Sequence, residues 1–138
     1  MKIIMLSGKS NCGKTTTLNK VYDFINPTEE NIIRAKSKLG SDLKDFECVI
    51  KYKGRTIVFF TMGDYSCYLL KAFEKYSVKQ CDFLICACNN RFKRPYQQIK
   101  KFNHLTINKK LSISQKLADI EVANNFDIEK IIEELNKQ

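Results

Sequence analysis

Residues 2–25 read KIIMLSGKSNCGKTTTLNKVYDFI, and three structural patterns follow one another in this stretch. The first is a contiguous apolar run over residues 3–6, which is typical of a short strand buried on both faces of a sheet. The second is a loop that opens at Gly8 and contains a further glycine at Gly13. The third is a helix, because apolar residues recur at helical spacing over residues 15–25. The stretch therefore predicts a strand–loop–helix unit.

The loop fits the pattern of a glycine, four residues and then Gly-Lys-Thr. Glycines let the backbone approach a phosphate group closely, and successive backbone N–H groups then form a nest for the anion. The helix that follows adds its unpaired N–H groups and the positive end of its dipole. The pattern predicts that a nucleotide contacts Gly8, Lys9, Ser10, Asn11, Cys12, Gly13, Lys14, Thr15 and Thr16.

In this motif and its position between a strand and a helix, the chain resembles the P-loop NTPase superfamily. The specific motif covers residues 8–15, and the alternation of strands and helices extends the resemblance more loosely over the whole chain. The resemblance implies that Lys14 bridges the β- and γ-phosphates of a nucleoside triphosphate. It also implies that the Thr15 hydroxyl is a ligand of Mg²⁺.

The rest of the chain alternates between strand-like and helix-like segments. Residues 46–52 and 56–61 flank Lys53-Gly54, which predicts an antiparallel hairpin. Further strands are predicted at 82–88, 105–108 and 119–123, and helices at 65–76, 95–101 and 127–135. Residues 28–39 are expected to form a short helix or a mobile connection, and residues 112–117 are ambiguous.

This alternation favours a three-layer α/β/α fold of the P-loop NTPase type. The expected sheet is mostly parallel, has about five to six strands and includes the hairpin between its second and third strands. With 138 residues, the chain has the size of one domain, so a single domain over residues 1–138 is expected.

P-loop proteins place an acidic residue at the end of a neighbouring strand, where it holds Mg²⁺ through water. Asp64 is the first acid after the strand at 56–61, and it is the predicted second metal residue beside Thr15. An alternative role for Asp64 is to cap the helix that follows it. Thr61 would orient a water, whereas Glu47 and Asp82 are weaker candidates because each opens a strand.

The hairpin resembles the layout of Ras-like GTPases, but the guanine-reading motif is incomplete. Residues 108–111 read NKKL and lack the aspartate that pairs with guanine, so ATP is favoured over GTP. Small-molecule and nucleotide kinases carry arginines after the fourth strand, and Arg91 and Arg94 match that position. With Lys14, these arginines would neutralise the transferring phosphoryl group. The leading hypothesis is therefore a Mg²⁺- and ATP-dependent phosphotransferase or hydrolase that acts on a small substrate.

The net charge of +9 is concentrated in the middle of the chain. Between residues 83 and 118 there are no acids, and the basic residues are Arg91, Lys93, Arg94, Lys100, Lys101, Lys109, Lys110 and Lys116. One alternative is therefore a nucleic-acid-associated NTPase in which residues 91–110 bind single strands, with Phe92, Tyr96 and Phe102 stacking on bases. Another is a nucleotide-dependent switch or binding module in which residues 26–45 respond to the nucleotide.

The six cysteines show no zinc-knuckle spacing. Cys86 and Cys88 would share one face of a strand with Ala87 opposite, and buried thiols are the expected state. A thiol inside the loop, Cys12, favours a reducing, cytoplasmic compartment. No apolar run approaches the roughly 20 residues of a membrane span, so no membrane association is expected. The one histidine, His104, is expected to lie at a strand edge.

Overall fold

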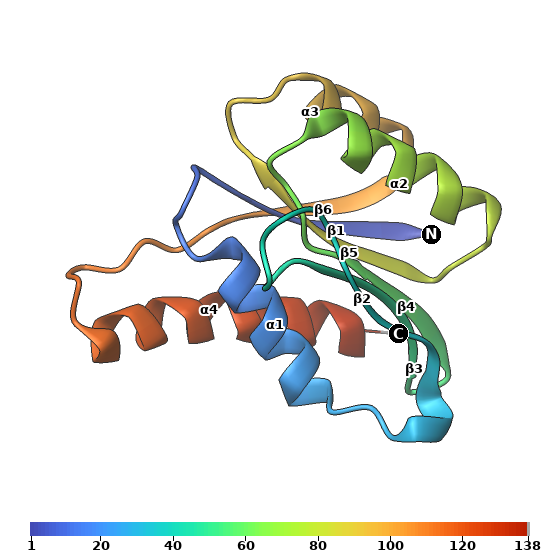
Figure 1. Ribbon diagram of the computed structural model, residues 1–138, viewed down its shortest axis with the longest axis horizontal. Helices are drawn as coiled ribbons and strands as arrows, with labels where there is room; N and C mark the ends of the chain where they lie inside the picture. Colours follow the sequence, from blue (N-terminus) through green and yellow to red (C-terminus); the bar gives the residue numbers. More distant parts are fainter. Residues whose placement is uncertain (138) are drawn as a thin grey trace.

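The computed structural model describes residues 1–137 and shows a mixed α/β fold around one six-stranded sheet (Figure 1). The strands are β1 Lys2–Gly8, β2 Ile32–Lys38, β3 Phe46–Tyr52, β4 Arg55–Phe60, β5 Phe83–Asn89 and β6 Asn103–Asn108. The α-helices are α1 Lys14–Ile25, α2 Ser66–Val78, α3 Arg94–Gln98 and α4 Leu117–Asn136. Two short 3₁₀ segments are Glu29–Asn31 and Ile99–Lys101. Among the helices of residues 1–137, none has both the length and the apolar character that crossing a bilayer requires.

The strand order is β2-β3-β4-β5-β1-β6. Strands β4, β5, β1 and β6 are parallel to one another, whereas β2–β3 and β3–β4 are antiparallel pairs. The predicted hairpin at 46–61 is confirmed as β3–β4. Its turn residues Lys53 and Gly54 have φ values of 50° and 77°, and two positive φ values in sequence suit the right-handed twist of a hairpin.

Side chains that alternate along the strands build a separate apolar core on each face of the sheet. Ile4 and Leu6 of β1 pack with α1 and α4, whereas Ile3 and Met5 pack on the side of α2. Figure 1 shows α1 and α4 below the sheet and α2 and α3 above it. Cys86 and Cys88 lie in the α2-side core and Ala87 in the other, as predicted, and all three are buried.

The expectation of a short helix or mobile connection over 28–39 is wrong. Only residues 29–31 are helical, and the segment continues as the edge strand β2, which pairs with β3. Six of the seven β2 residues are exposed, so the strand buries too little to leave an apolar pattern in the sequence. Its β-branched pair Ile32 and Ile33 and the pairing offered by β3 decide the conformation.

The strand predicted at 119–123 is also wrong, because those residues belong to α4. This helix begins at Leu117 and runs without a break through the predicted helix at 127–135. Its buried positions recur at helical spacing from Ala123 onward, whereas its first turns are exposed or half-buried. The sheet nevertheless has six strands, because β2 supplies the sixth.

Gly63 lies where β4 leads into α2, and its backbone runs directly against β5. The Asn89 N–H donates to the Gly63 carbonyl at 3.0 Å, and a Cβ at Gly63 would lie 2.5 Å from the Ala87 carbonyl oxygen. Because backbone meets backbone here, no side chain can move to relieve the clash. We expect Gly63→Ala to lower the free energy of unfolding by about 3 kcal/mol in urea titrations.

Gly54→Ala is the matched control for this prediction. A Cβ at Gly54 meets nothing within 4 Å, so the substitution adds only the strain of its positive φ, about 1–2 kcal/mol. Equal losses in the two variants would contradict the clash at Gly63.

Candidate functional site

The Gly8–Thr15 loop leaves the carboxyl end of β1 between two parallel neighbours. Gly8 is paired with Asn89 of β5, and Ser7 is paired with Asn108 of β6. Ligands of open α/β sheets bind at this edge, where helix N-termini and strand ends converge. The loop leads directly into α1, as predicted, and Gly13 at its end has a left-handed φ of 97°.

Lys14 is folded into the mouth of this loop. Its ammonium group donates to the carbonyl oxygens of Gly8 at 2.9 Å and Lys9 at 2.6 Å, and the residue is 7% exposed. It also lies 3.8 Å from the Cys12 sulfur. These contacts hold a positive charge at the centre of the loop, while Lys9, Ser10 and Asn11 remain exposed.

Residues at the ends of the neighbouring strands, and directly after them, hold the loop from both sides through hydrogen bonds. On the β5 side, the Asn89 side-chain amide donates to Ser10 Oγ at 2.7 Å, and the Asn90 N–H donates to the Gly8 carbonyl at 3.0 Å. On the β6 side, the Lys109 N–H donates to the Ser7 carbonyl at 2.7 Å. The loop is therefore held at its start and in its middle.

A buried ion pair lies under the β6 side of the loop. Lys109 Nζ is 3.0 Å from Asp127 Oδ2, and the two side chains are 1% and 0% exposed. The same oxygen accepts the Lys110 N–H at 2.9 Å. A Cβ at Gly8 would lie 3.1 Å from Lys109 Cβ, so the lysine stem packs directly against the loop.

Asp45 is a site residue that the sequence analysis did not identify. Its Oδ1 accepts hydrogen bonds from the hydroxyl groups of Thr15 and Thr61, each at 3.0 Å, and the residue is 6% exposed. Both bonds use one oxygen, and no protein partner within residues 1–137 engages Oδ2. Burial raises the pKa of the Asp45 carboxyl, while its bonds to Thr15 and Thr61 partly oppose the shift.

We expect Asp45→Asn to increase the free energy of unfolding at pH 7, in the absence of nucleotide. Because burial raises the folded-state pKa of Asp45, the folded protein binds this proton more tightly than the unfolded chain does. Stability is therefore lost as the pH rises through the folded-state pKa, and the asparagine variant avoids that loss. The gain should shrink as the pH falls toward about 4, where the unfolded carboxyl is also protonated.

Urea titrations between pH 4 and pH 7 measure this difference, and Asp23→Asn on the exposed side of α1 is the control. A gain that is independent of pH, or that appears equally in the control, would contradict the burial of an ionised carboxylate at Asp45.

Asp64 lies beside the same loop but is exposed. A pocket of about 260 Å³ is lined by Asn11, Gly13, Lys14, Thr15, Thr16, Asp42, Lys44, Thr61, Gly63 and Asp64. We call it the loop pocket. The alternative role of Asp64 as a helix cap is wrong, because α2 begins after Tyr65 and has no side-chain cap. Thr61 is buried, and its hydroxyl is occupied by Asp45 and by the Phe46 N–H.

The two weaker acid candidates lie at different edges of the sheet. Asp82 accepts the Thr56 N–H at the start of the parallel strands, away from the loop, as expected. Glu47 opens β3, but β3 is antiparallel to β4 and pairs Glu47 with Phe60. Its start therefore lies at the loop edge, contrary to the expectation for Glu47. There its carboxylate contacts Tyr76 and Lys75.

Arg91 and Arg94 lie outside the loop pocket. Both are exposed. The Arg91 N–H donates to Asn89 Oδ1 in the turn after β5, and Arg94 begins α3. His104 is exposed on the edge strand β6, as expected, with Nδ1 2.9 Å from the Phe102 carbonyl.

The acids near the loop do not form a complete metal site by themselves. Within residues 1–137, no group of three or more His, Cys, Asp or Glu side chains is placed to hold a metal ion. Protein sites for Mg²⁺ commonly use one or two carboxylates together with substrate phosphates and water. The donor set of Thr15, Asp45 and Asp64 fits that kind of site. Comparisons of the chain with protein-family models, curated proteins and solved structures find no match.

Proposed function

We propose that this chain is a single-domain P-loop NTPase with three α/β/α layers, which binds ATP together with Mg²⁺. The observation that carries the proposal is the Gly8–Thr15 loop, which holds a buried lysine ammonium at the carboxyl edge of four parallel strands. Helices on both faces of the sheet support the proposed architecture. The loop sequence and its place before α1 suit a triphosphate.

In this proposal Lys14 exchanges its carbonyl partners for phosphate oxygens. The ammonium group already lies within the loop, so binding requires a change of hydrogen-bond acceptors and little reordering of the side chain. Backbone N–H groups of the loop and of the first turn of α1 would donate to the same phosphates. The exposed residues Lys9 to Asn11 would cover them from outside.

In this proposal Asp45 is a third residue of the metal site, beside the predicted metal residues Thr15 and Asp64. The Thr15 hydroxyl and Asp45 are already in contact, and Asp45 Oδ2 is available to a cation or to its water shell. Asp64 lines the same pocket. Bound Mg²⁺ would neutralise phosphate charge, and these side chains would hold the cation in position.

ATP remains the preferred nucleotide over GTP in the proposal. Residues 108–111 match only the first half of the guanine-reading motif. Its lysine, Lys109, forms an ion pair with Asp127 and donates a hydrogen bond to the Lys110 carbonyl. No carboxylate follows at Leu111 to pair with guanine. The reaction we propose is Mg²⁺-dependent phosphotransfer to a small substrate or hydrolysis of the γ-phosphate.

A thermal-shift panel of ATP, GTP, ADP and GDP, each with and without Mg²⁺, tests the proposal. At 100 times the Kd, a ligand stabilises the folded state by about 2.7 kcal/mol, which is easily measured. The largest shift is expected for ATP with Mg²⁺. The absence of a shift with every nucleotide would overturn the proposal. Release of phosphate from ATP is measured on the same samples, and binding without turnover would favour a nucleotide-dependent switch.

A further inference from the structure

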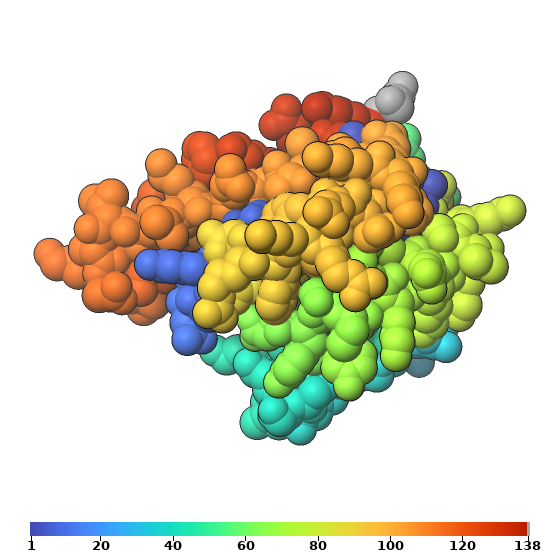
Figure 2. All heavy atoms as spheres, turned by 90° about the horizontal axis from the view of Figure 1, so that it is seen from above, coloured from blue at the N-terminus to red at the C-terminus, as the bar shows by residue number. Residues whose placement is uncertain are grey.

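A second and larger cleft adjoins the loop pocket. Its volume is about 820 Å³, within the roughly 300–1,000 Å³ typical of small-molecule sites. It lies between the segment at residues 38–47 and helix α2. Figure 2 shows these segments, in turquoise and green, side by side on one face of the molecule. Asp42 and Asp64 line both this cleft and the loop pocket, so the two adjoin each other.

The walls of this cleft offer surfaces for a flat ring. Tyr65, directly before α2, and Tyr68, in its first turn, are 57% and 48% exposed, and their ring centroids lie 5.9 Å apart in an edge-to-face arrangement. Phe60 and Met62 add buried apolar surface. Aromatic side chains that remain exposed beside such a surface are suited to stacking on a ring-bearing ligand.

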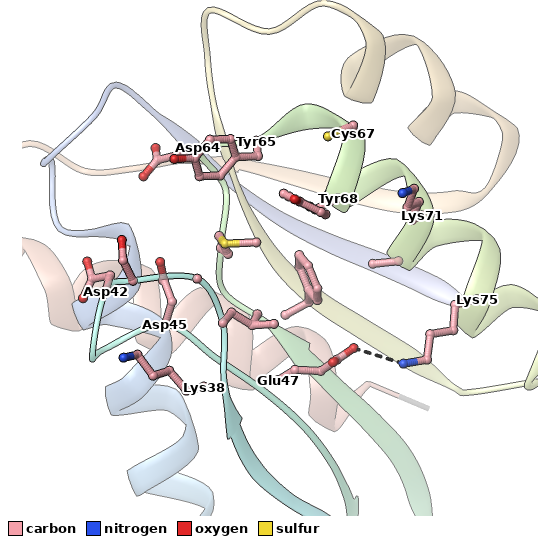
Figure 3. A pocket seen from close by; sticks show the side chains of 16 residues that line it. Lys38, Asp42, Asp45, Glu47, Asp64, Tyr65, Cys67, Tyr68, Lys71 and Lys75 are labelled. Atoms are coloured by element: carbon pink, nitrogen blue, oxygen red, sulfur yellow. Dashed lines mark ion pairs between the residues drawn. The ribbon is translucent and has the colours of Figure 1, made fainter.

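Charge is distributed unevenly along the cleft (Figure 3). Asp42, Asp45 and Asp64 lie at the end near the loop, where these three acids outnumber the one lysine, Lys38. Lys71 and Lys75 lie on α2 at the other end. Lys75 is 3.5 Å from Glu47, which compensates its charge. Lys71 has no ion-pair partner within residues 1–137, and its nearest aromatic group is the Tyr68 ring at 5.8 Å.

We propose that this cleft binds a second ligand, a ring-bearing phosphate monoester such as a nucleoside monophosphate. Its ring lies against Tyr65 and Tyr68, and its phosphate pairs with Lys71. The acids at the loop end repel a phosphate, so they orient the ligand with its anionic group toward α2. The inference rests on the proposed function only in assigning the triphosphate to the loop pocket.

Binding of AMP, CMP and UMP to the full chain, each compared with its nucleoside, tests the inference by calorimetry. We expect each monophosphate to bind at least about tenfold more tightly than its nucleoside, because only the monophosphate can form a charge-assisted hydrogen bond with Lys71. Lys71→Met should abolish that difference, whereas Lys79→Met, an exposed lysine that does not line the cleft, should preserve it. Tyr68→Ala should weaken both members of each pair.

Two further measurements separate this inference from the proposed function. Lys14→Ala should leave monophosphate binding intact, and loss of binding in that variant would place the ligand in the loop pocket and overturn the inference. ATP binding is measured on the same samples. If ATP does not bind but the monophosphates still bind in a Lys71-dependent way, the proposed function is overturned and the inference stands. No monophosphate binding, or equal effects of Lys71→Met and Lys79→Met, would overturn the inference.

Discussion

Lys14→Ala is expected to weaken ATP binding at least about 100-fold, because two charge-assisted hydrogen bonds at 1.5–3 kcal/mol each are lost. Within residues 1–137, the hydrogen-bond partners of the native ammonium are loop groups, namely the carbonyls of Gly8 and Lys9 and the Cys12 sulfur. Alanine is also the best helix former, and residue 14 begins α1. The fold should therefore persist while the phosphate site loses its central charge.

Lys9→Ala provides the matched control within the same loop. Lys9 is exposed, so solvent screens its charge, and its contact with Lys14 is a backbone carbonyl that alanine retains. Calorimetric titration with ATP and Mg²⁺, together with urea unfolding of each variant, measures both effects. Equal loss of affinity in the two variants would contradict the central place of Lys14, as would unchanged affinity in Lys14→Ala.

Lys109→Met is expected to lower the free energy of unfolding by about 3–5 kcal/mol, because it leaves the Asp127 carboxylate buried without its cation. The two side chains are almost fully buried, and Asp127 Oδ1 has no hydrogen-bond partner within residues 1–137. In the described part of the chain, this carboxylate also accepts the Lys110 N–H. Lys110→Met, which changes an adjacent exposed side chain, should change stability by less than about 0.5 kcal/mol.

A second substitution distinguishes an unpaired charge from lost packing. Replacing a whole buried ion pair by apolar residues is often neutral, so Lys109→Met with Asp127→Leu should recover most of the loss. Urea titrations of the two single variants and the double variant give the coupling energy. A double variant as unstable as the sum of the singles would show that the charges are not coupled.

The sequence predicts the centre of this fold better than its edges. Strands β1 and β5 are contiguous apolar runs because both faces of each are covered, and the loop between β1 and α1 carries its own motif. Strand β2 lies at an edge and is mostly exposed, so pairing with β3 decides its conformation. The first turns of α4 also bury little, and its Asn124-Asn125 step interrupts the apolar pattern.

The candidate site likewise contains residues that a local pattern can predict and residues that only the fold brings together. The place of the loop between a strand and a helix could be predicted, because its glycine spacing is a local pattern. Asp45 could not, because its contact with Thr15 spans 30 residues and depends on how β3 pairs with β4. Placing Arg91 and Arg94 likewise depends on the path of the chain after β5, which no local pattern determines.

In the proposed complex with Mg²⁺, the carboxylate of Asp45 would couple cation binding to proton release. Burial raises the pKa of this group, so the folded protein retains its proton at pH values where an exposed aspartate has already lost it. A divalent cation requires the ionised form and would displace that proton. Calorimetry in buffers of different ionisation enthalpy should therefore detect protons released on binding ATP with Mg²⁺, and fewer should be released in Asp45→Asn.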